Sequence, residues 1–204
     1  MSISNTFFRF ALAFSFFSFS LALLAEPTLE EVVVSARKVD ESVQDVPIAM
    51  SVFTSSDISD AGIERPEDFI ALTPNVVMAN TVNVGDTLVT IRGLTSTRDA
   101  ESNFAFVVDG VLQTNPNAFN RELLDIAQIE VLKGPQGALY GRNATSGAIL
   151  ITTKAPSEES ESTAVIGMGV NNASKLQYVN SGKMGDNVYT RFSVSTRETD
   201  GEHT

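Results

Sequence analysis

The chain has 204 residues, no cysteine, no tryptophan and a single histidine, His203. Its 25 acidic residues outnumber its 14 lysines and arginines, which gives a formal net charge of −11. The missing cysteines exclude disulfides and thiolate metal sites, and the acid excess argues against nucleic acid as a partner. We therefore expect no catalytic residues, no bound metal and no cofactor, and the chain is not expected to be an enzyme.

The N-terminus has the pattern of an export signal. Residues 10–25 form an uncharged run of apolar residues and serines after Arg9, and Glu26 follows at once. A transmembrane helix needs about 20 apolar residues, so this run predicts a secretory signal peptide over residues 1–25, with an N-terminal anchor as the alternative. Cleavage after Ala22 or after Ala25 stays open. The mature chain is expected to work outside the cytoplasm.

The first part of the mature chain mixes short strands and short helices. Residues 28–38 contain three successive valines without an evident partner strand, and residues 39–46 are expected to be loose. Residues 48–53 predict a strand. Several N-cap residues at 54–57 then predict a short helix, and Pro and two acids at 66–68 predict another helix over 66–72.

Five short apolar runs predict the strands of a sheet, over residues 76–79, 88–92, 104–108, 129–132 and 148–153. The third run is almost wholly apolar, so we expect it to be buried on both faces. The second and third runs, joined by residues 94–103, are predicted to form a hairpin. A short helix is predicted over 122–128. Together these elements indicate a small α+β domain with a mixed sheet.

Glycines are dense between the last two of these strands, at Gly134, Gly137, Gly141 and Gly147. Their spacing matches neither of the common glycine-rich phosphate-binding motifs. Glycine lacks a Cβ, so we expect these residues to permit tight turns and close backbone approach.

The composition changes at residues 156–162, an acidic and serine-rich stretch that predicts a linker. Beyond it, apolar residues alternate with polar or small ones, most clearly over residues 188–195, and turns are predicted at 171–174 and 185–187. Three strands of about ten residues with one apolar face are typical of a transmembrane β-barrel. A half-solvated soluble sheet would give the same alternation.

Residues 129–154, IEVLKGPQGALYGRNATSGAILITTK, resemble the end of the plug domain of TonB-dependent outer-membrane receptors. Other segments resemble that family in the same order: EEVVVSA at 30–36, IRG at 91–93 and VDGV at 108–111. The resemblance covers nearly all of residues 29–196. It implies a TonB-box segment over 26–45, a plug domain over 46–155, the linker at 156–162 and the first barrel strands over 163–204.

The expected fold class is therefore an α+β plug domain with a small mixed sheet and short helices, followed by the start of an antiparallel transmembrane β-barrel. A barrel of this family closes with about 22 strands, so the barrel is expected to be truncated in this chain.

The resemblance implies that one segment binds the periplasmic domain of TonB, which carries energy from an inner-membrane complex. The residues are Glu31, Val32, Val33, Val34, Ser35 and Ala36. Successive valines favour the extended conformation that β-strand addition requires. An ordinary first strand of the plug is the alternative.

Two further sets of residues are candidates for a role in transport. Charged residues within apolar or glycine-rich motifs are expected to seat the plug by pairing with the barrel wall: Arg92, Glu130, Lys133 and Arg142. If the predicted hairpin forms, the loops before and after it share one end, which by resemblance faces the outside and contacts the substrate. Those loops contain Asn80, Asn83, Asp86, Gln113, Asn115 and Asn117.

The function that the resemblance implies is energy-coupled transport across the bacterial outer membrane, with the plug inside the barrel lumen. The expected substrate is a scarce small polar molecule or metal chelate, most commonly a ferric siderophore, while cobalamin, haem and oligosaccharide stay open. The rival hypothesis is a secreted or periplasmic plug-only module that binds its ligand without transport.

Overall fold

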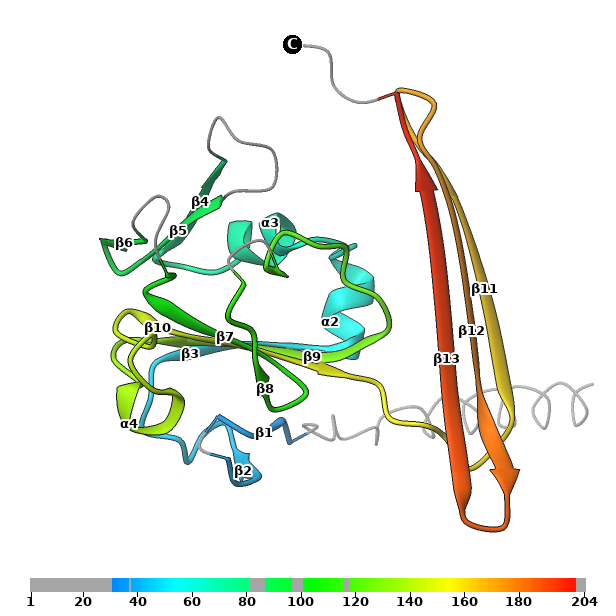
Figure 1. Ribbon diagram of the computed structural model, residues 1–204, viewed down its shortest axis with the longest axis horizontal. Helices are drawn as coiled ribbons and strands as arrows, with labels where there is room; N and C mark the ends of the chain where they lie inside the picture. The colour runs from blue at the N-terminus through cyan, green and yellow to red at the C-terminus, as the bar shows by residue number, and fades with distance from the viewer. Residues whose placement is uncertain (1–30, 37, 81–86, 97–100, 116–117, 201–204) are drawn as a thin grey trace, which may run out of the picture. The chain divides into compact units, whose positions relative to one another are not determined.

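A computed structural model describes residues 31–36, 38–80, 87–96, 101–115 and 118–200 of the chain (Figure 1). The predicted signal peptide at 1–25 lies outside the described residues. The elements described below all belong to one unit, Val32–Thr204.

A five-stranded mixed sheet forms the centre of the plug region, in the order β3, β9, β10, β7, β8. Strands β7 and β10 run parallel, and the other neighbours are antiparallel. The strands are β3 (Met50–Thr54), β7 (Phe104–Val108), β8 (Val111–Leu112), β9 (Ile126–Lys133) and β10 (Gly147–Thr153). The mixed sheet is as predicted, and so are the strands at 104–108 and 148–153.

Both faces of this sheet are buried. Side chains alternate along a strand, so β10 directs Ile149 and Ile151 into one apolar cluster and Ala148 and Leu150 into another. Helices α2 and α3 cover the first face, and the N-terminal segment with β1 and β2 covers the second (Figure 1). The covering elements are α2 (Ser55–Asp60), α3 (Pro66–Ala71), β1 (Val33–Val34), β2 (Glu41–Ser42) and α4 (Gly137–Tyr140). The expected two-sided burial of β7 is confirmed.

Two of the three predicted helices, α2 and α3, are present, and their own sequences cap their N-termini. The Thr54 hydroxyl accepts from the Asp57 backbone N–H at 3.3 Å, and the Asp57 carboxylate accepts from the Thr54 N–H at 2.8 Å. These bonds form a capping box at the start of α2, and the hydrogen bond to the Thr54 side chain lowers the pKa of Asp57. Helix α3 begins with Pro66, where a missing N–H costs nothing.

An aromatic cluster joins α3 to β7 in the first core. The Phe119 ring lies 5.2 Å from that of Phe104, 5.1 Å from that of Phe106 and 6.3 Å from that of Phe69, in edge-on arrangements. Edge-to-face packing is favoured because the positive ring edge meets the negative ring face. The loop before β9 is thereby fixed to the sheet.

The hairpin predicted from residues 88–92 and 104–108 does not form. β5 (Thr87–Ile91) pairs with β4 (Val76–Asn80) and β6 (Leu94–Thr95) in a separate three-stranded sheet. Arg92 and Gly93 both have positive φ, +50° and +81°, and this tight turn sends the chain straight back along β5 as β6. The edge of β5 is therefore occupied before the chain reaches β7.

The helix predicted over residues 122–128 is also wrong. β9 begins at Ile126, and Asp125 before it has a φ of +57°, which no right-handed helix accommodates. Ile129 and Val131 then alternate with Glu130 and Leu132 across the two faces of the sheet.

The C-terminal strands form an antiparallel meander of β11 (Glu161–Met168), β12 (Ser174–Gly185) and β13 (Val188–Glu198). The predicted turns connect them. On β13, Phe192 and Val194 are 61% and 48% exposed, whereas Arg191, Ser193 and Ser195 are only partly exposed. The predicted alternation is therefore present, with one outward apolar face.

Candidate functional site

The Val box, defined here as residues 31–36, is docked on the plug. Val34 and Ala36 are 1% and 0% exposed and belong to the second core, whereas Val33 is 49% exposed. The expectation that this segment lacks a partner strand is wrong, because the chain turns back and β2 pairs with β1. In this state the Val box is part of the plug.

Two side chains of β9 hold the backbone of the Val box. Gln128 Nε2 donates to the Val33 carbonyl oxygen at 3.0 Å, and the Ser35 N–H donates to Glu130 Oε1 at 3.1 Å. Gln128 and Glu130 are two residues apart on one strand, so their side chains leave the same face of the sheet. The Val box is thus attached to the main sheet by side-chain hydrogen bonds.

Glu130 is the only charged residue that is buried in the part of the chain that the structure describes, at 1% exposure. Its Oε1 accepts from the Ser35 N–H, from the Ser35 hydroxyl at 3.3 Å and from Gln128 Nε2 at 3.1 Å. Its Oε2 has no hydrogen-bond partner. Burial raises the pKa of Glu130 and the nearby charge of Asp40 adds to this, against the lowering effect of the hydrogen bonds.

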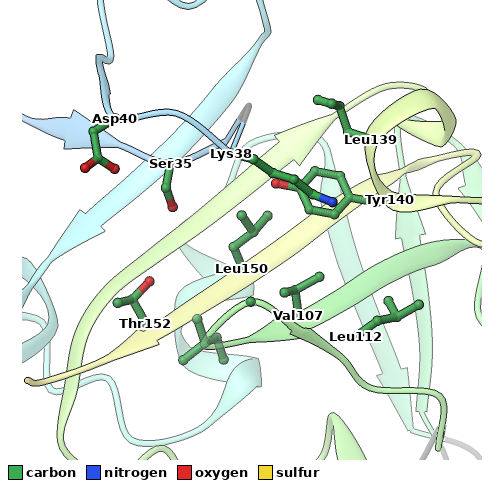
Figure 2. Close-up of a pocket in the computed structure, with 11 residues that line it drawn as sticks. Ser35, Lys38, Asp40, Val107, Leu112, Leu139, Tyr140, Leu150 and Thr152 are labelled. Atoms are coloured by element: carbon green, nitrogen blue, oxygen red, sulfur yellow. The ribbon is translucent and has the colours of Figure 1, made fainter.

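A cavity of about 500 Å³ lies beside the Val box (Figure 2). Ser35 borders it on one side and Tyr140 on the other, over Leu150 of β10. The Tyr140 hydroxyl donates to the Ala36 carbonyl oxygen at 2.8 Å, and the ammonium group of Lys38 lies 5.7 Å from the centre of the Tyr140 ring. Burial raises the pKa of Tyr140 to about 12, so its hydroxyl remains a donor at neutral pH.

The six candidate substrate contacts are only partly described. Three lie outside the described residues: Asn83, Asp86 and Asn117. Asn80 ends β4, and Gln113 follows β8, where its Nε2 donates to the Val111 carbonyl oxygen at 3.2 Å; Asn115 comes two residues later. These loops share one end only if the predicted hairpin forms, and it does not, so their role in binding stays a prediction.

The four candidate seating residues lie in three separate places. Glu130 faces the Val box, and Arg142 Nη2 pairs with Glu101 Oε1 at 2.9 Å on the surface. Arg92 and Lys133 are neighbours, since the charge of Arg92 adds to burial in lowering the pKa of Lys133. Their pairing with a barrel wall stays a prediction.

Ion pairs that sequence reasoning missed connect the plug to the C-terminal strands. Arg191 of β13 pairs with Asp125 through both its Nε and its Nη2, the latter at 2.8 Å, and its Nη1 lies 2.7 Å from Glu161 Oε1. The side chains of Arg191 and Asp125 are only 13% and 9% exposed. The positive φ of Asp125, which excludes the predicted helix, also positions this carboxylate.

A second set of ion pairs lies on the same face. Lys175 Nζ is 3.0 Å from Glu64 Oε1 and 3.2 Å from Glu122 Oε1, and Arg197 Nη1 is 2.9 Å from Glu64 Oε2. Lys175 and Arg197 are direct cross-strand partners. The sequence signal for these ion pairs was a lysine or arginine on the polar side of a strand whose residues alternate between apolar and polar. In these contacts the plug supplies the acids and the strands supply the bases.

Over the described ranges, no group of three or more histidine, aspartate or glutamate residues is placed to hold a metal ion. In the same ranges, no helix has the length and apolar character needed to cross a membrane.

Residues 42–148 match the family model described as the TonB-dependent receptor plug domain. The chain belongs to the TonB-dependent receptor family. The solved structure of the ferric yersiniabactin uptake receptor FyuA from Yersinia pestis resembles this plug with a TM-score of 0.67 at 27% identity, over 72% of this chain and 24% of that one. The recognition and the fold class predicted from the sequence are confirmed.

Curated relatives agree with this assignment. The chain is 31% identical to the pesticin receptor of Yersinia enterocolitica over 132 residues, which is 64% of this chain and 19% of the relative. It is 28% identical to the vitamin B12 transporter BtuB of Vibrio vulnificus over 180 residues, which is 85% of this chain and 28% of the relative. The chain thus spans less than a third of these TonB-dependent relatives, which are receptors and transporters rather than enzymes.

Proposed function

We propose that this chain is the plug-bearing part of an outer-membrane receptor that imports a scarce small molecule with energy supplied by TonB. In this proposal the plug lies inside a barrel lumen, and TonB binds the Val box by strand addition. The plug's role is to couple substrate binding on one side to TonB engagement on the other.

The observation that carries the proposal is the way in which the Val box is attached. It pairs with only two residues of β2, and side chains rather than a strand ladder connect it to the main sheet. Release of such a segment breaks no strand pairing of the five-stranded sheet, although it uncovers the second core around Val34 and Ala36. An extended Val-rich segment that is both docked and removable suits a partner that adds a strand.

The exposed face of the C-terminal strands supports a transporter over a plug-only module. Ile166, Met168 and Phe192 are 74%, 90% and 61% exposed on one face of the meander. Barrel strands direct such a face to lipid. Their polar face carries Arg191 and Lys175, which pair with the plug, as expected for the inner wall of a lumen.

A ferric siderophore is the substrate that we favour. The named relatives include a receptor for ferric yersiniabactin and a transporter for vitamin B12, so the proposal keeps to a small polar molecule or metal chelate. The candidates for contacting it within the described residues are Asn80, Gln113 and Asn115. Uptake of radiolabelled iron from a panel of siderophores, with labelled cobalamin in parallel, tests the substrate class.

The experiment that tests coupling is Val33→Pro in the full-length receptor. Proline lacks the backbone N–H and fixes φ, so uptake should be abolished while surface binding of the substrate persists. The matched control is Val33→Ala, which keeps the N–H and should retain uptake. Normal uptake in the proline variant contradicts the proposal.

A further inference from the structure

The two hydrogen-bonding edges of the Val box have different neighbours. The Val43 N–H donates to the Val32 carbonyl oxygen at 3.0 Å, and Val34 pairs with Glu41. In an antiparallel pair, successive residues direct their backbone groups to opposite edges. Val32 and Val34 therefore face β2, and the backbone groups of Val33 and Ser35 point the other way. The Ser35 carbonyl oxygen accepts from the Lys38 N–H at 2.8 Å, so what we call the outer edge consists of the Val33 carbonyl oxygen and the Ser35 N–H.

Side chains of β9 occupy the outer edge in the manner of a strand. Gln128 presents an N–H to the Val33 carbonyl oxygen at 3.0 Å, and Glu130 presents an oxygen to the Ser35 N–H at 3.1 Å. A neighbouring strand would offer the same two groups, one donor and one acceptor, to residues two apart. A further bond of 3.1 Å from Gln128 Nε2 to Glu130 Oε1 holds the two side chains together.

We propose that Gln128 and Glu130 act as a strand mimic that covers the outer edge of the Val box, and that an incoming strand must displace them to pair there. The proposal rests on strand addition at the Val box as the coupling step. In addition, Gln128 and Glu130 compete with TonB for the same backbone groups of the Val box. They are positioning residues that determine how readily TonB binds.

The environment of Glu130 favours separation of the Gln128–Glu130 pair from the Val box. Glu130 is buried with Oε2 unpartnered, and burying a carboxylate without full hydrogen bonding is costly. Asp40, on the N-terminal segment itself, adds like-charge repulsion that raises the pKa of Glu130 together with burial. When the Val box leaves, the carboxylate regains water and moves away from Asp40.

Hydrogen exchange of the Ser35 amide in the full-length receptor tests the cover directly. A hydrogen bond to a carboxylate is among the stronger ones, so Glu130→Ala should speed exchange by about ten- to a hundredfold. Gln128→Ala, at a half-buried position, removes the bond to the Val33 carbonyl oxygen but keeps the bond from the Ser35 N–H to Glu130, so it should speed exchange by about three- to tenfold. This second variant keeps the test intact if Glu130→Ala does not fold. Unchanged exchange in every folded variant overturns the proposal.

The matched control is Tyr140→Phe, which removes a hydrogen bond to the Val box at Ala36 but leaves the outer edge covered. It should leave Ser35 exchange unchanged. If it accelerates exchange as much as Glu130→Ala does, the two β9 side chains only contribute to general docking and the proposal is wrong.

Affinity for the purified periplasmic domain of TonB separates this proposal from the one on which it rests. Glu130→Ala and Gln128→Ala should bind more tightly than the unaltered receptor, in proportion to their exchange rates. If Ser35 exchange becomes faster but the affinity for TonB does not increase, while Val33→Pro still abolishes TonB binding, then Gln128 and Glu130 do not compete with TonB and the proposal is wrong. If Val33→Pro binds normally, strand addition at the Val box is refuted, whereas the cover itself is still judged by Ser35 exchange.

Discussion

Gly147 is the position where one added methyl group should do the most damage to the plug. A Cβ there would lie 2.2 Å from the Leu132 carbonyl oxygen and 3.2 Å from Ile91 Cδ1. Leu132 belongs to β9, which pairs with β10 in register, and Ile91 is fully buried. A backbone oxygen inside a ladder cannot swing aside as a side chain does, so the two strands must separate locally.

We expect Gly147→Ala to lower the free energy of unfolding by about 3 kcal/mol or more, at the upper end of overpacking costs. In the chain without its first 25 residues that corresponds to about 6–12 °C in Tm. The matched control is Gly137→Ala in α4, where a Cβ meets nothing within 4 Å. Alanine is the better helix former, so this variant should be stabilised by about 0.5–1 kcal/mol.

Thermal unfolding of the chain without its first 25 residues, followed by circular dichroism, measures both variants side by side. A Gly147→Ala protein that melts at the wild-type temperature would show that β9 and β10 do not approach as described. The same result would refute the expectation that close backbone approach requires a glycine at position 147.

Three other predictions follow from charge and topology. Burial raises the pKa of Glu130 above its ordinary 4.5, so the folded state binds this proton more tightly than the unfolded state does. The free energy of unfolding should therefore fall as pH rises from about 4.5 through the raised pKa. Glu130→Gln should flatten that slope in urea titrations. Arg191→Met should cost about 3 kcal/mol by leaving the largely buried Asp125 carboxylate without its partner. The cost should be much smaller in an Asp125→Asn background, as a double-mutant cycle of unfolding would show. If the plug fills the barrel from the periplasmic side, a cysteine at Ala173 should be labelled by an impermeant thiol reagent on intact cells and one at Asp186 should not; the reverse pattern contradicts the topology.

Local patterns predicted the elements whose environment is uniform along their length. β7 reads FAFVV, and a short run of successive apolar residues is typical of a strand that is buried on both faces. β13 alternates because one face meets the plug side and the other is exposed. In both cases the sequence carries the burial pattern itself.

Pairing between distant segments was not predictable in the same way. The partner of β7 is β10, about 40 residues later and parallel, whereas sequence reasoning paired β7 with its nearest preceding strand. The turn at Arg92 and Gly93 has no signal strong enough to announce that β6 fills that edge. Glu130 contacts Ser35, which lies 95 residues away in the sequence. Nothing near Glu130 in the sequence indicates this contact, so its charge suggested an exposed side chain, whereas the structure buries it.

The plug–strand ion pairs show the same limit. Arg191 was visible on the polar side of an alternating strand, but its partner Asp125 lay in a segment that was predicted as helix. Sequence reasoning therefore assigned the seating bases to the plug. The structure adds pairs in which the plug supplies the acids. Arg92, Lys133 and Arg142 remain candidates for contacts with a barrel wall, whereas Glu130 is buried against the Val box.

In the proposed function, TonB binds this protein by pairing a strand with the Val box. The most direct measurement is disulfide cross-linking in cells between single cysteines at residues 32–35 of the full-length receptor and a cysteine series in the periplasmic domain of TonB. Strand pairing predicts cross-links in one residue-by-residue register, and their yield should increase when substrate is added. Cross-links that arise only from another exposed strand such as β8, with none from residues 32–35 at saturating substrate, would contradict it.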